Sequence, residues 1–236
     1  MREAIEKRVS RRNFTGEPLS ASQIEAIQRL TAAANERSGL TIEFVEDGGI
    51  AFSNVRTTYG IFSKVRAMLL MKGKEDMADF REKIGYYGES LLLDIVDMGL
   101  GTCWVGGTFD RDAFVHAEGE AIPDVILIGN IGKPGLKDRL MMQVNHRNRT
   151  PLEARITSDE PLPDWIKSGM EAVIAAPSAM NKQKPRFEYS KGILTATVPN
   201  DYRADLTDLG IAKLHFEIGA DNGGHFEFGN GKRYLV

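Results

Sequence analysis

The spacing of hydrophobic residues predicts helices and strands along the whole chain. The clearest pattern covers residues 74–98, where apolar side chains recur three or four positions apart, as on the buried face of a helix. Residues 90–96 are apolar on most sides, so this helix is expected to be central and buried. Gly99 and Gly101 are expected to end it.

Shorter helices are expected on both sides of this segment. Ser20 and Gln23 form a capping-box pattern, which predicts a helix from there to about residue 35. Other helices are predicted at residues 5–9, 111–116, 165–176 and 206–219. Pro177 is expected to end the helix 165–176, because proline cannot continue a helix.

Strands are predicted where short runs of apolar and β-branched residues stand between turn residues. These runs cover residues 41–45, 67–71, 102–105, 124–131, 187–189, 193–198, 225–228 and 233–236. Glycine-containing turns join the last four into two hairpins. The order of elements is similar in both parts, and residues 157–163 have the composition of a linker. Two half-domains, residues 1–156 and 157–236, are therefore expected.

Composition excludes several classes of protein. A hydrophobic share of 42% in 236 residues suffices for a folded core, and a net charge of −3 gives no reason to expect nucleic acid or an anionic membrane as partner. Apolar runs are too short to span a bilayer, and the first residues lack the apolar core of a signal peptide. A cytoplasmic protein is expected, in keeping with a single cysteine, Cys103.

The histidines and cysteine predict no metal site. None of the four histidines has a ligand-type partner at metalloprotease spacing, and one cysteine cannot build a thiolate zinc site. His215 lies on an apolar helix, which favours a satisfied core position. No arrangement of catalytic acid, base or nucleophile stands out, so no catalytic side chain is predicted.

Two local patterns are candidates for ligand binding. In the first, Arg8, Ser10 and Arg12 stand where a short helix enters a loop, and their guanidinium and hydroxyl groups suit a phosphate. In the second, Ser178, Asn181 and Gln183 follow Pro177, and their neutral side chains suit a flat heteroaromatic ligand. The alternatives are a solvated helix face and a helix end followed by a turn.

Together with two further motifs, these patterns resemble the nitroreductase family of FMN-dependent oxidoreductases. The four motifs are Arg8-Val9-Ser10-Arg11-Arg12-Asn13-Phe14, Thr102-Cys103-Trp104-Val105-Gly106-Gly107, the pair Arg147 and Arg149 before Pro151, and residues 176–183. The resemblance implies an α+β, FMN-binding fold of two half-domains, with central antiparallel or mixed sheets and long buried helices.

The resemblance also implies a role for each matching residue. Arg8, with Val9 and Ser10 beside it, would contact the FMN phosphate and ribityl chain, and Arg12 would lie near the N1/O2 edge of the ring. Gly106 and Gly107 would offer main-chain N–H groups near flavin N5. The phosphate would also be held by Arg147 and Arg149, and the other side of the ring would be covered by Pro177, Ser178 and Asn181.

The chain departs from the usual pattern in motif order. The Pro-Ser motif stands far after Ser10, although in typical members it follows closely and two subunits share each site. A single-chain pseudo-dimer with one complete FMN site is the simplest explanation, so a monomer or a weak homo-oligomer is expected. The sequence after Gln183 reads Lys184-Pro185-Arg186 instead of Pro-Trp-Arg, which changes the shape of the loop.

The activity implied by the resemblance is ping-pong hydride transfer from NADH or NADPH to a small-molecule electron acceptor such as a nitroaromatic or a quinone. Three alternatives stay open. A flavin enzyme of the same fold could carry out dehalogenation or flavin breakdown. The chain could be a non-catalytic FMN-binding or sensor protein, or an α/β interaction protein without a cofactor.

Overall fold

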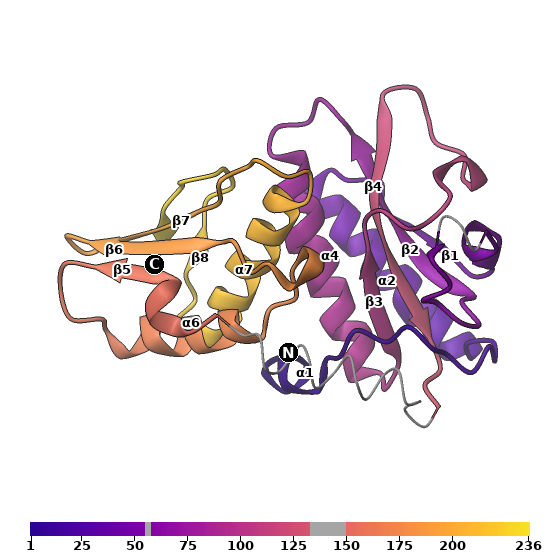
Figure 1. The fold of residues 1–236 in the computed structure, drawn as a ribbon, viewed down its shortest axis with the longest axis horizontal. Coiled ribbons are helices and arrows are strands. Elements are labelled where there is room, and N and C mark those ends of the chain that lie inside the picture. The colour runs from indigo at the N-terminus through magenta and orange to yellow at the C-terminus, as the bar shows by residue number, and fades with distance from the viewer. Residues whose placement is uncertain (55–57, 133–149) are drawn as a thin grey trace. The chain divides into compact units, whose positions relative to one another are not determined.

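The computed structural model describes residues 1–54, 58–132 and 150–236 (Figure 1). The chain forms two compact units. Unit 1 comprises Met1–Glu6, Arg81–Ser90 and Asn145–Val236, and unit 2 comprises Lys7–Phe80 and Leu91–Val144. The long helix α4 (Phe80–Asp97) contributes residues to both. The expected division of the chain at residues 156 and 157 stays a prediction.

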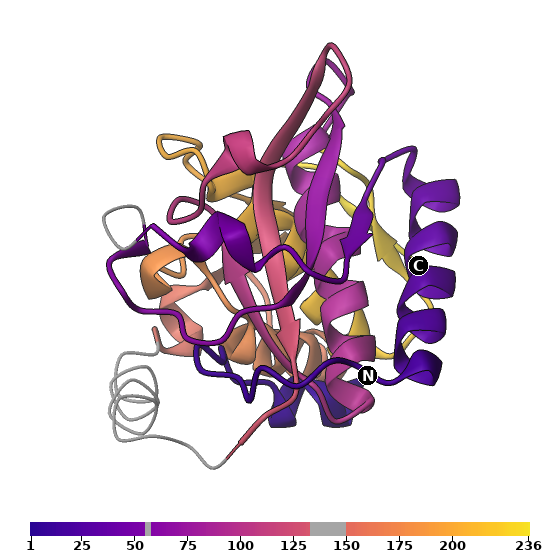
Figure 2. The same ribbon diagram turned by 90° about the vertical axis from the view of Figure 1, so that its right-hand side faces the viewer.

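Unit 2 is built on a four-stranded antiparallel sheet in the order β1-β2-β4-β3. Its strands are β1 (Glu43–Val45), β2 (Ala67–Lys74), β3 (Gly101–Val105) and β4 (Glu120–Gly129). The 3-10 turns η1 (Gly49–Phe52) and η2 (Arg111–Ala113) lie in the connections. Helix α2 (Ala21–Ser38) runs alongside the strands in Figure 2. The predicted capping box of Ser20 and Gln23 is confirmed at its start.

The sheet of unit 2 is buried on both faces. Met68 and Leu70 point to one face, where they pack with Leu127 of β4 and with Phe14. Leu69 points to the opposite face and is equally buried. Burial of both faces explains why residues 67–71 of β2 and 125–128 of β4 are apolar runs without polar alternation.

Unit 1 contains two helices that pack together, α6 (Asp164–Ala175) and α7 (Asp205–Ala220), with a three-stranded and a two-stranded sheet. The strands are β5 (Ile156–Ser158), β6 (Arg186–Ser190), β7 (Ile193–Thr197), β8 (His225–Phe226) and β9 (Tyr234–Leu235). Both predicted hairpins, β6–β7 and β8–β9, are confirmed. The remaining elements are α1 (Arg2–Lys7), η3 (Leu152–Ala154) and η4 (Ala179–Asn181).

Several predicted boundaries are wrong. The central helix begins at Phe80 and not near residue 74, because Gly73 and Lys74 continue β2 and pair with β4. Helix α1 ends at Lys7 and leaves Val9 outside, and the helix predicted at 111–116 is only the turn η2. The expected linker at 157–163 begins within β5, which pairs with β6 in parallel. No helix in the described ranges is long and apolar enough to cross a membrane.

Two glycines bring α7 close to the first part of α4 within unit 1. A Cβ atom on Gly210 would lie 2.0 Å from the carbonyl oxygen of Glu82, and one on Gly85 would lie 2.0 Å from that of Thr207. Both contacts are with main-chain atoms, which cannot turn aside as a side chain can. The two helix segments therefore require glycine at both positions.

Charged side chains are buried beside this contact, and each has a partner. Lys213 and Glu82 are each 1% exposed, and their Nζ and Oε1 atoms lie 2.5 Å apart. The Lys213 ammonium also donates to the carbonyl oxygens of Glu227 and Gly229, each at 2.9 Å. A buried charge without a partner is costly. Loss of either Lys213 or Glu82 would therefore leave the other charge unpaired and destabilise the packing of α7.

His215 is a core residue of α7, as the sequence predicted. The side chain is fully buried, and its Nδ1 lies 3.1 Å from the carbonyl oxygen of Ala172. Since a carbonyl can only accept, Nδ1 carries a proton. Nε2 lies 2.8 Å from Oε1 of Glu89, so a hydrogen bond joins the imidazole to this buried carboxyl group.

A first prediction concerns Gly210. The substitution Gly210→Ala should destabilise the protein by about 3 kcal/mol, because the added methyl group overlaps a main-chain carbonyl of α4. The measurement is the free energy of unfolding in urea. Gly132→Ala is the control, since the nearest atom to its added Cβ is 3.7 Å away. Equal stability of the two variants would show that the helices are not in this close contact.

A second prediction concerns Glu217 of α7. Its carboxylate accepts hydrogen bonds from the Tyr86 hydroxyl at 2.5 Å and the Phe226 N–H at 2.7 Å. Burial nevertheless dominates and raises the pKa of Glu217 from 4.5 to about 7. The folded protein therefore binds this proton more tightly than the unfolded chain. The resulting stability is fully present below pH 4.5 and is lost as the pH rises through about 7.

Glu217→Gln should remove this dependence. We expect the variant to match the wild type near pH 4.5 and to exceed its stability by about 3 kcal/mol at pH 8.5, measured by urea unfolding. Glu171→Gln, which changes an exposed side chain of α6, is the control and should follow the wild-type pH profile. A Glu217→Gln profile parallel to that of the wild type would contradict the assignment.

Candidate functional site

The first candidate motif is attached to strand β3 within unit 2. Ser10 forms a parallel β-bridge with Thr102, and the Arg11 N–H donates to the Thr102 carbonyl at 2.8 Å. The Arg12 carbonyl accepts from the Ser63 N–H at 2.9 Å. Main-chain hydrogen bonds on both sides therefore hold Arg12 in place, although it lies in no helix or strand.

The guanidinium groups of this motif make the first part of β3 electropositive. Arg8 and Arg12 are half-buried, and the charges of both lower the pKa of the Cys103 thiol. Burial outweighs them, so that pKa lies above its usual value. In the part of the chain that the structure describes, the Arg12 guanidinium has no hydrogen bond or ion pair. It can therefore bind an anionic or acceptor-rich ligand.

The second candidate motif is the glycine turn that follows β3. The Gly106 carbonyl accepts a hydrogen bond from Arg111 at 2.6 Å. A Cβ on Gly106 would lie 2.5 Å from Oδ1 of Asp124, so a larger residue there would have to displace this buried carboxyl group. Gly107 is exposed, and its N–H has no acceptor among the described residues. The turn thus presents a main-chain donor, and together with Arg12 its chemistry fits a flavin, whose ring edge is rich in acceptors.

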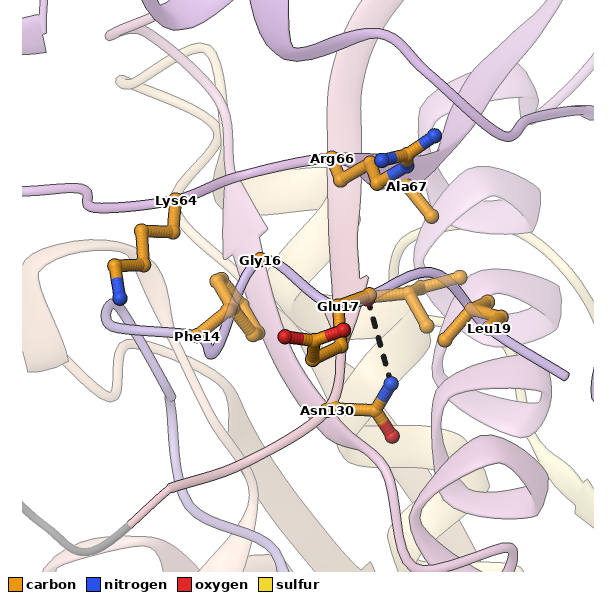
Figure 3. A pocket seen from close by; sticks show the side chains of 10 residues that line it. Phe14, Gly16, Glu17, Leu19, Lys64, Arg66, Ala67 and Asn130 are labelled. Atoms are coloured by element: carbon orange, nitrogen blue, oxygen red, sulfur yellow. Dashed lines mark hydrogen bonds between the residues drawn. The ribbon is translucent and has the colours of Figure 1, made fainter.

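A narrow pocket lies beside Phe14, the last residue of the first motif. It is lined by Phe14, Gly16, Glu17, Leu19, Lys64, Arg66, Ala67, Ile128, Gly129 and Asn130. Figure 3 shows the charged ends of Lys64 and Arg66 pointing away from each other. The Asn130 amide donates to the Glu17 carbonyl at 3.4 Å, which ties two walls together. None of the predicted cofactor residues lines this pocket.

The third candidate motif follows α6 in unit 1. Helix α6 ends at Ala175, before Pro177 as predicted. The Ser178 Oγ accepts from the Gln183 N–H at 2.9 Å, and the Asn181 Oδ1 accepts from the Gln183 amide at 2.7 Å. Asn181 and Gln183 both have positive φ angles, of 54° and 50°. Side-chain hydrogen bonds hold this unusual backbone in place.

Gln183 has the structural role that the sequence analysis gave as the alternative to ligand binding. It is 3% exposed, and its Oε1 accepts from the Thr150 N–H at 2.8 Å and from the guanidinium of Arg155. Arg155 is itself buried and donates to the Val173 carbonyl at 3.0 Å. Gln183 therefore holds the loop to the core of unit 1.

Two residues that hold this loop were missed by sequence reasoning. Arg155 binds Gln183, and the Asp208 carboxylate accepts from the Ala179 N–H at 3.0 Å. Asp208 is 29 residues from Ala179 in the chain. No local sequence pattern links the two residues of either pair. The one sequence signal for Asp208 is that an acidic residue stands among apolar residues in the helix α7.

Lys184 stands where the resembled motif has proline, and it forms an ionic contact of its own. Its ammonium binds Asp201 and lies 3.0 Å from Oδ2 of Asp205. Asp205 is buried and also accepts from the Tyr202 N–H at 3.1 Å. The altered sequence is thus anchored to the start of α7.

The structure positions the remaining predicted residues only in part. Arg147 and Arg149 lie outside the described residues. The motif around Arg12 and the glycine turn belong to unit 2, whereas Pro177, Ser178 and Asn181 belong to unit 1. Their assembly into one FMN site stays a prediction.

Comparison with known sequences identifies the family. The profile of a family described as "Putative TM nitroreductase" matches residues 1–220. The chain belongs to this family. No curated protein matches the sequence of this nitroreductase-family protein.

Solved structures with a similar fold extend the comparison. A "putative nitroreductase" from Thermotoga maritima is 22% identical, with a TM-score of 0.64, over 99% of this chain and 91% of its own. A nitroreductase family protein from Clostridium difficile is 18% identical, with a TM-score of 0.50, over 69% and 99%. The NADPH:FMN oxidoreductase of Vibrio harveyi is 16% identical, with a TM-score of 0.46, over 61% and 84%. The predicted α+β nitroreductase fold is confirmed.

A third prediction concerns the loop anchor. Gln183→Leu should lower the free energy of unfolding by about 2–4 kcal/mol, because it deprives the buried Arg155 of an acceptor. Urea unfolding and limited proteolysis at the loop are the measurements. Met180→Gln, which alters a 66% exposed side chain of the same loop, should stay within about 0.5 kcal/mol of the wild type. Similar losses in both variants would argue against the anchor.

Proposed function

We propose that this nitroreductase-family protein is an FMN-dependent NAD(P)H oxidoreductase that reduces nitroaromatic or quinone-type acceptors by ping-pong hydride transfer. One observation carries the proposal: a single strand, β3, has the basic segment bonded at its start and the glycine turn at its end. Thr102 and Gly106 are four residues apart, roughly 13 Å along an extended strand. Cationic and N–H donor groups are thus spaced along an edge suited to an elongated, anionic cofactor.

The residues proposed to hold FMN come from both units. Arg8 and Ser10 would bind the phosphate and ribityl chain, with Arg147 and Arg149 on the phosphate. Arg12 would lie at the N1/O2 edge, and Gly106 and Gly107 would donate near N5. The opposite side of the ring would be covered by Pro177, Ser178 and Asn181. A chain of this kind would work as a single-chain pseudo-dimer with one FMN.

FMN, when bound, supplies the hydride chemistry, and NADH or NADPH is the proposed reductant. The chain's own groups would bind FMN, orient its ring and tune its reduction potential. The positive charge of Arg12 favours negative charge on the nearby ring edge, because opposite charges attract strongly where water is partly excluded. No side-chain acid or base is assigned a step, and the acceptor can take its proton from solvent.

A fourth prediction tests this proposal directly. The purified full-length protein, incubated with FMN and freed of excess, should show the spectrum of oxidised flavin with one FMN per chain. Anaerobic NADH or NADPH should bleach it, and a nitroaromatic or a quinone should restore it. Bound flavin that neither nucleotide bleaches would favour an FMN-binding protein without this activity. Absence of FMN binding would overturn the proposal.

A matched pair of variants ties FMN binding to the basic segment. Arg12→Ala should weaken FMN binding about 10- to 100-fold, the usual value of a lost charge-assisted hydrogen bond, measured by quenching of flavin fluorescence. Arg29→Ala removes an arginine that is 72% exposed on α2 and should leave the affinity unchanged. Equal affinities of the two variants would place FMN elsewhere.

A further inference from the structure

We propose that Arg111 is a positioning residue that sets the direction of the Gly107 N–H, and through it the reduction potential of the bound flavin. The inference rests on the proposed function, because it concerns FMN near the glycine turn. Arg111 belongs to none of the motifs that the sequence singled out. It lies in η2, on the connection between β3 and β4.

The Arg111 side chain binds three main-chain carbonyl groups. Its Nη2 donates to the carbonyl oxygens of Gly106 at 2.6 Å and Pro123 at 2.9 Å. Its Nε donates to the carbonyl oxygen of Ile122 at 3.1 Å. The guanidinium carbon lies 4.4 Å from the centre of the Phe109 ring. Phe109 is 2% exposed and belongs to the core of unit 2. Arg111 is therefore fixed by β4, by its own connection and by the core.

Planarity of the peptide bond transmits this restraint to Gly107. The carbonyl of Gly106 and the N–H of Gly107 belong to one peptide unit, and in a trans peptide they point in opposite directions. Because Arg111 holds the carbonyl on its own side, the N–H must point away from Arg111. That N–H has no acceptor within the described residues, and Gly107 is exposed. The Gly107 N–H can therefore donate a hydrogen bond to a bound ligand.

The peptide between Gly106 and Gly107 needs a restraint on its orientation more than a peptide between two larger residues does. Glycine has no Cβ and adopts many backbone conformations at little cost, so a peptide between two glycines can rotate easily. A larger residue at position 106 would have to displace the buried Asp124 carboxyl group, whose Oδ1 would lie 2.5 Å from the added Cβ. A side chain at position 106 would thus disturb Asp124, whereas Arg111 stiffens the turn through the Gly106 carbonyl.

The Arg111 charge acts in the same direction as its geometry. A cation bonded to the carbonyl polarises the peptide unit and strengthens the N–H as a donor. Reduction adds negative charge to the ring, so a stronger and better-aligned donor favours the reduced form over the oxidised form. Without Arg111 the peptide could turn and present its carbonyl oxygen, which repels that charge.

The experiment compares Arg111→Gln and Arg111→Lys with Arg29→Gln in the FMN-loaded full-length protein. Arg29→Gln also removes one positive charge of unit 2 but is remote from the glycine turn. Arg111→Gln should weaken the binding of reduced FMN relative to oxidised FMN about tenfold. That change equals a midpoint potential about 30 mV lower for a two-electron couple. Arg111→Lys should be intermediate, because an ammonium keeps the charge but cannot span three carbonyl groups.

A second measurement keeps the inference separate from the proposed function. Residual dipolar couplings of the Gly107 N–H, in the full-length protein without FMN, report the direction of this bond. They should fit the structure in the wild type and in Arg29→Gln, and should not fit in Arg111→Gln. If FMN does not bind the wild type, the proposed function fails at that step. If FMN binds but the Arg111 variants keep the wild-type potential or the wild-type coupling, the inference is wrong.

Gly107→Pro serves if the Arg111 variants do not fold, because it removes the N–H while leaving Arg111 in place. It should lower the potential in the same direction as Arg111→Gln. An unchanged potential in Gly107→Pro would overturn the inference, since the donor would then have no effect on the flavin.

Discussion

The pairing of β3 with β4 is the interaction on which the candidate site of unit 2 depends. Burial of both sheet faces fixes its register, because a shift by one residue would exchange Thr102 and Cys103 between the faces. The opposite edge of β3 accepts the segment of Ser10 and Arg11 at its start. Segments far apart in the sequence thereby become neighbours on one strand. The positions of the basic groups and of the glycine turn follow from this pairing.

Unit 1 relies on a different principle, in which buried polar groups specify how α7 packs. Lys213 binds Glu82, and His215 binds Glu89, so both of these buried groups meet a partner on α4. A one-turn displacement of α7 would separate both pairs and leave charges in an apolar core, at a cost of several kcal/mol. The same helix carries Asp208, which binds the loop after α6. The conformation of that loop is therefore tied to the packing of the core.

Family membership and these local structures support one view of the chemistry. Among the described residues, the two candidate motifs of unit 2 offer cations and main-chain donors held at defined places. Groups of this kind suit the proposed role, in which the chain would bind and tune a cofactor that brings its own reactivity. Lys184, at which the sequence departs from the resembled motif, binds two aspartates near the start of α7.

The sequence by itself determined the helices, the hairpins and the local motifs. Each depends on residues within a few positions of one another, as with Ser20 and Gln23 or the apolar repeat of α4. The periodicity misplaced the start of α4, because the pairing of Gly73 with β4 overrides a local helical pattern. Arg8, Arg12 and Gly106 could be proposed as site residues because their motifs are contiguous, and their role stays a prediction. Only the tertiary structure decided that Gln183 is buried and that Arg111, Arg155 and Asp208 hold the loops. Their partners are brought together by strand pairing and helix packing, and no spacing along the chain records those contacts.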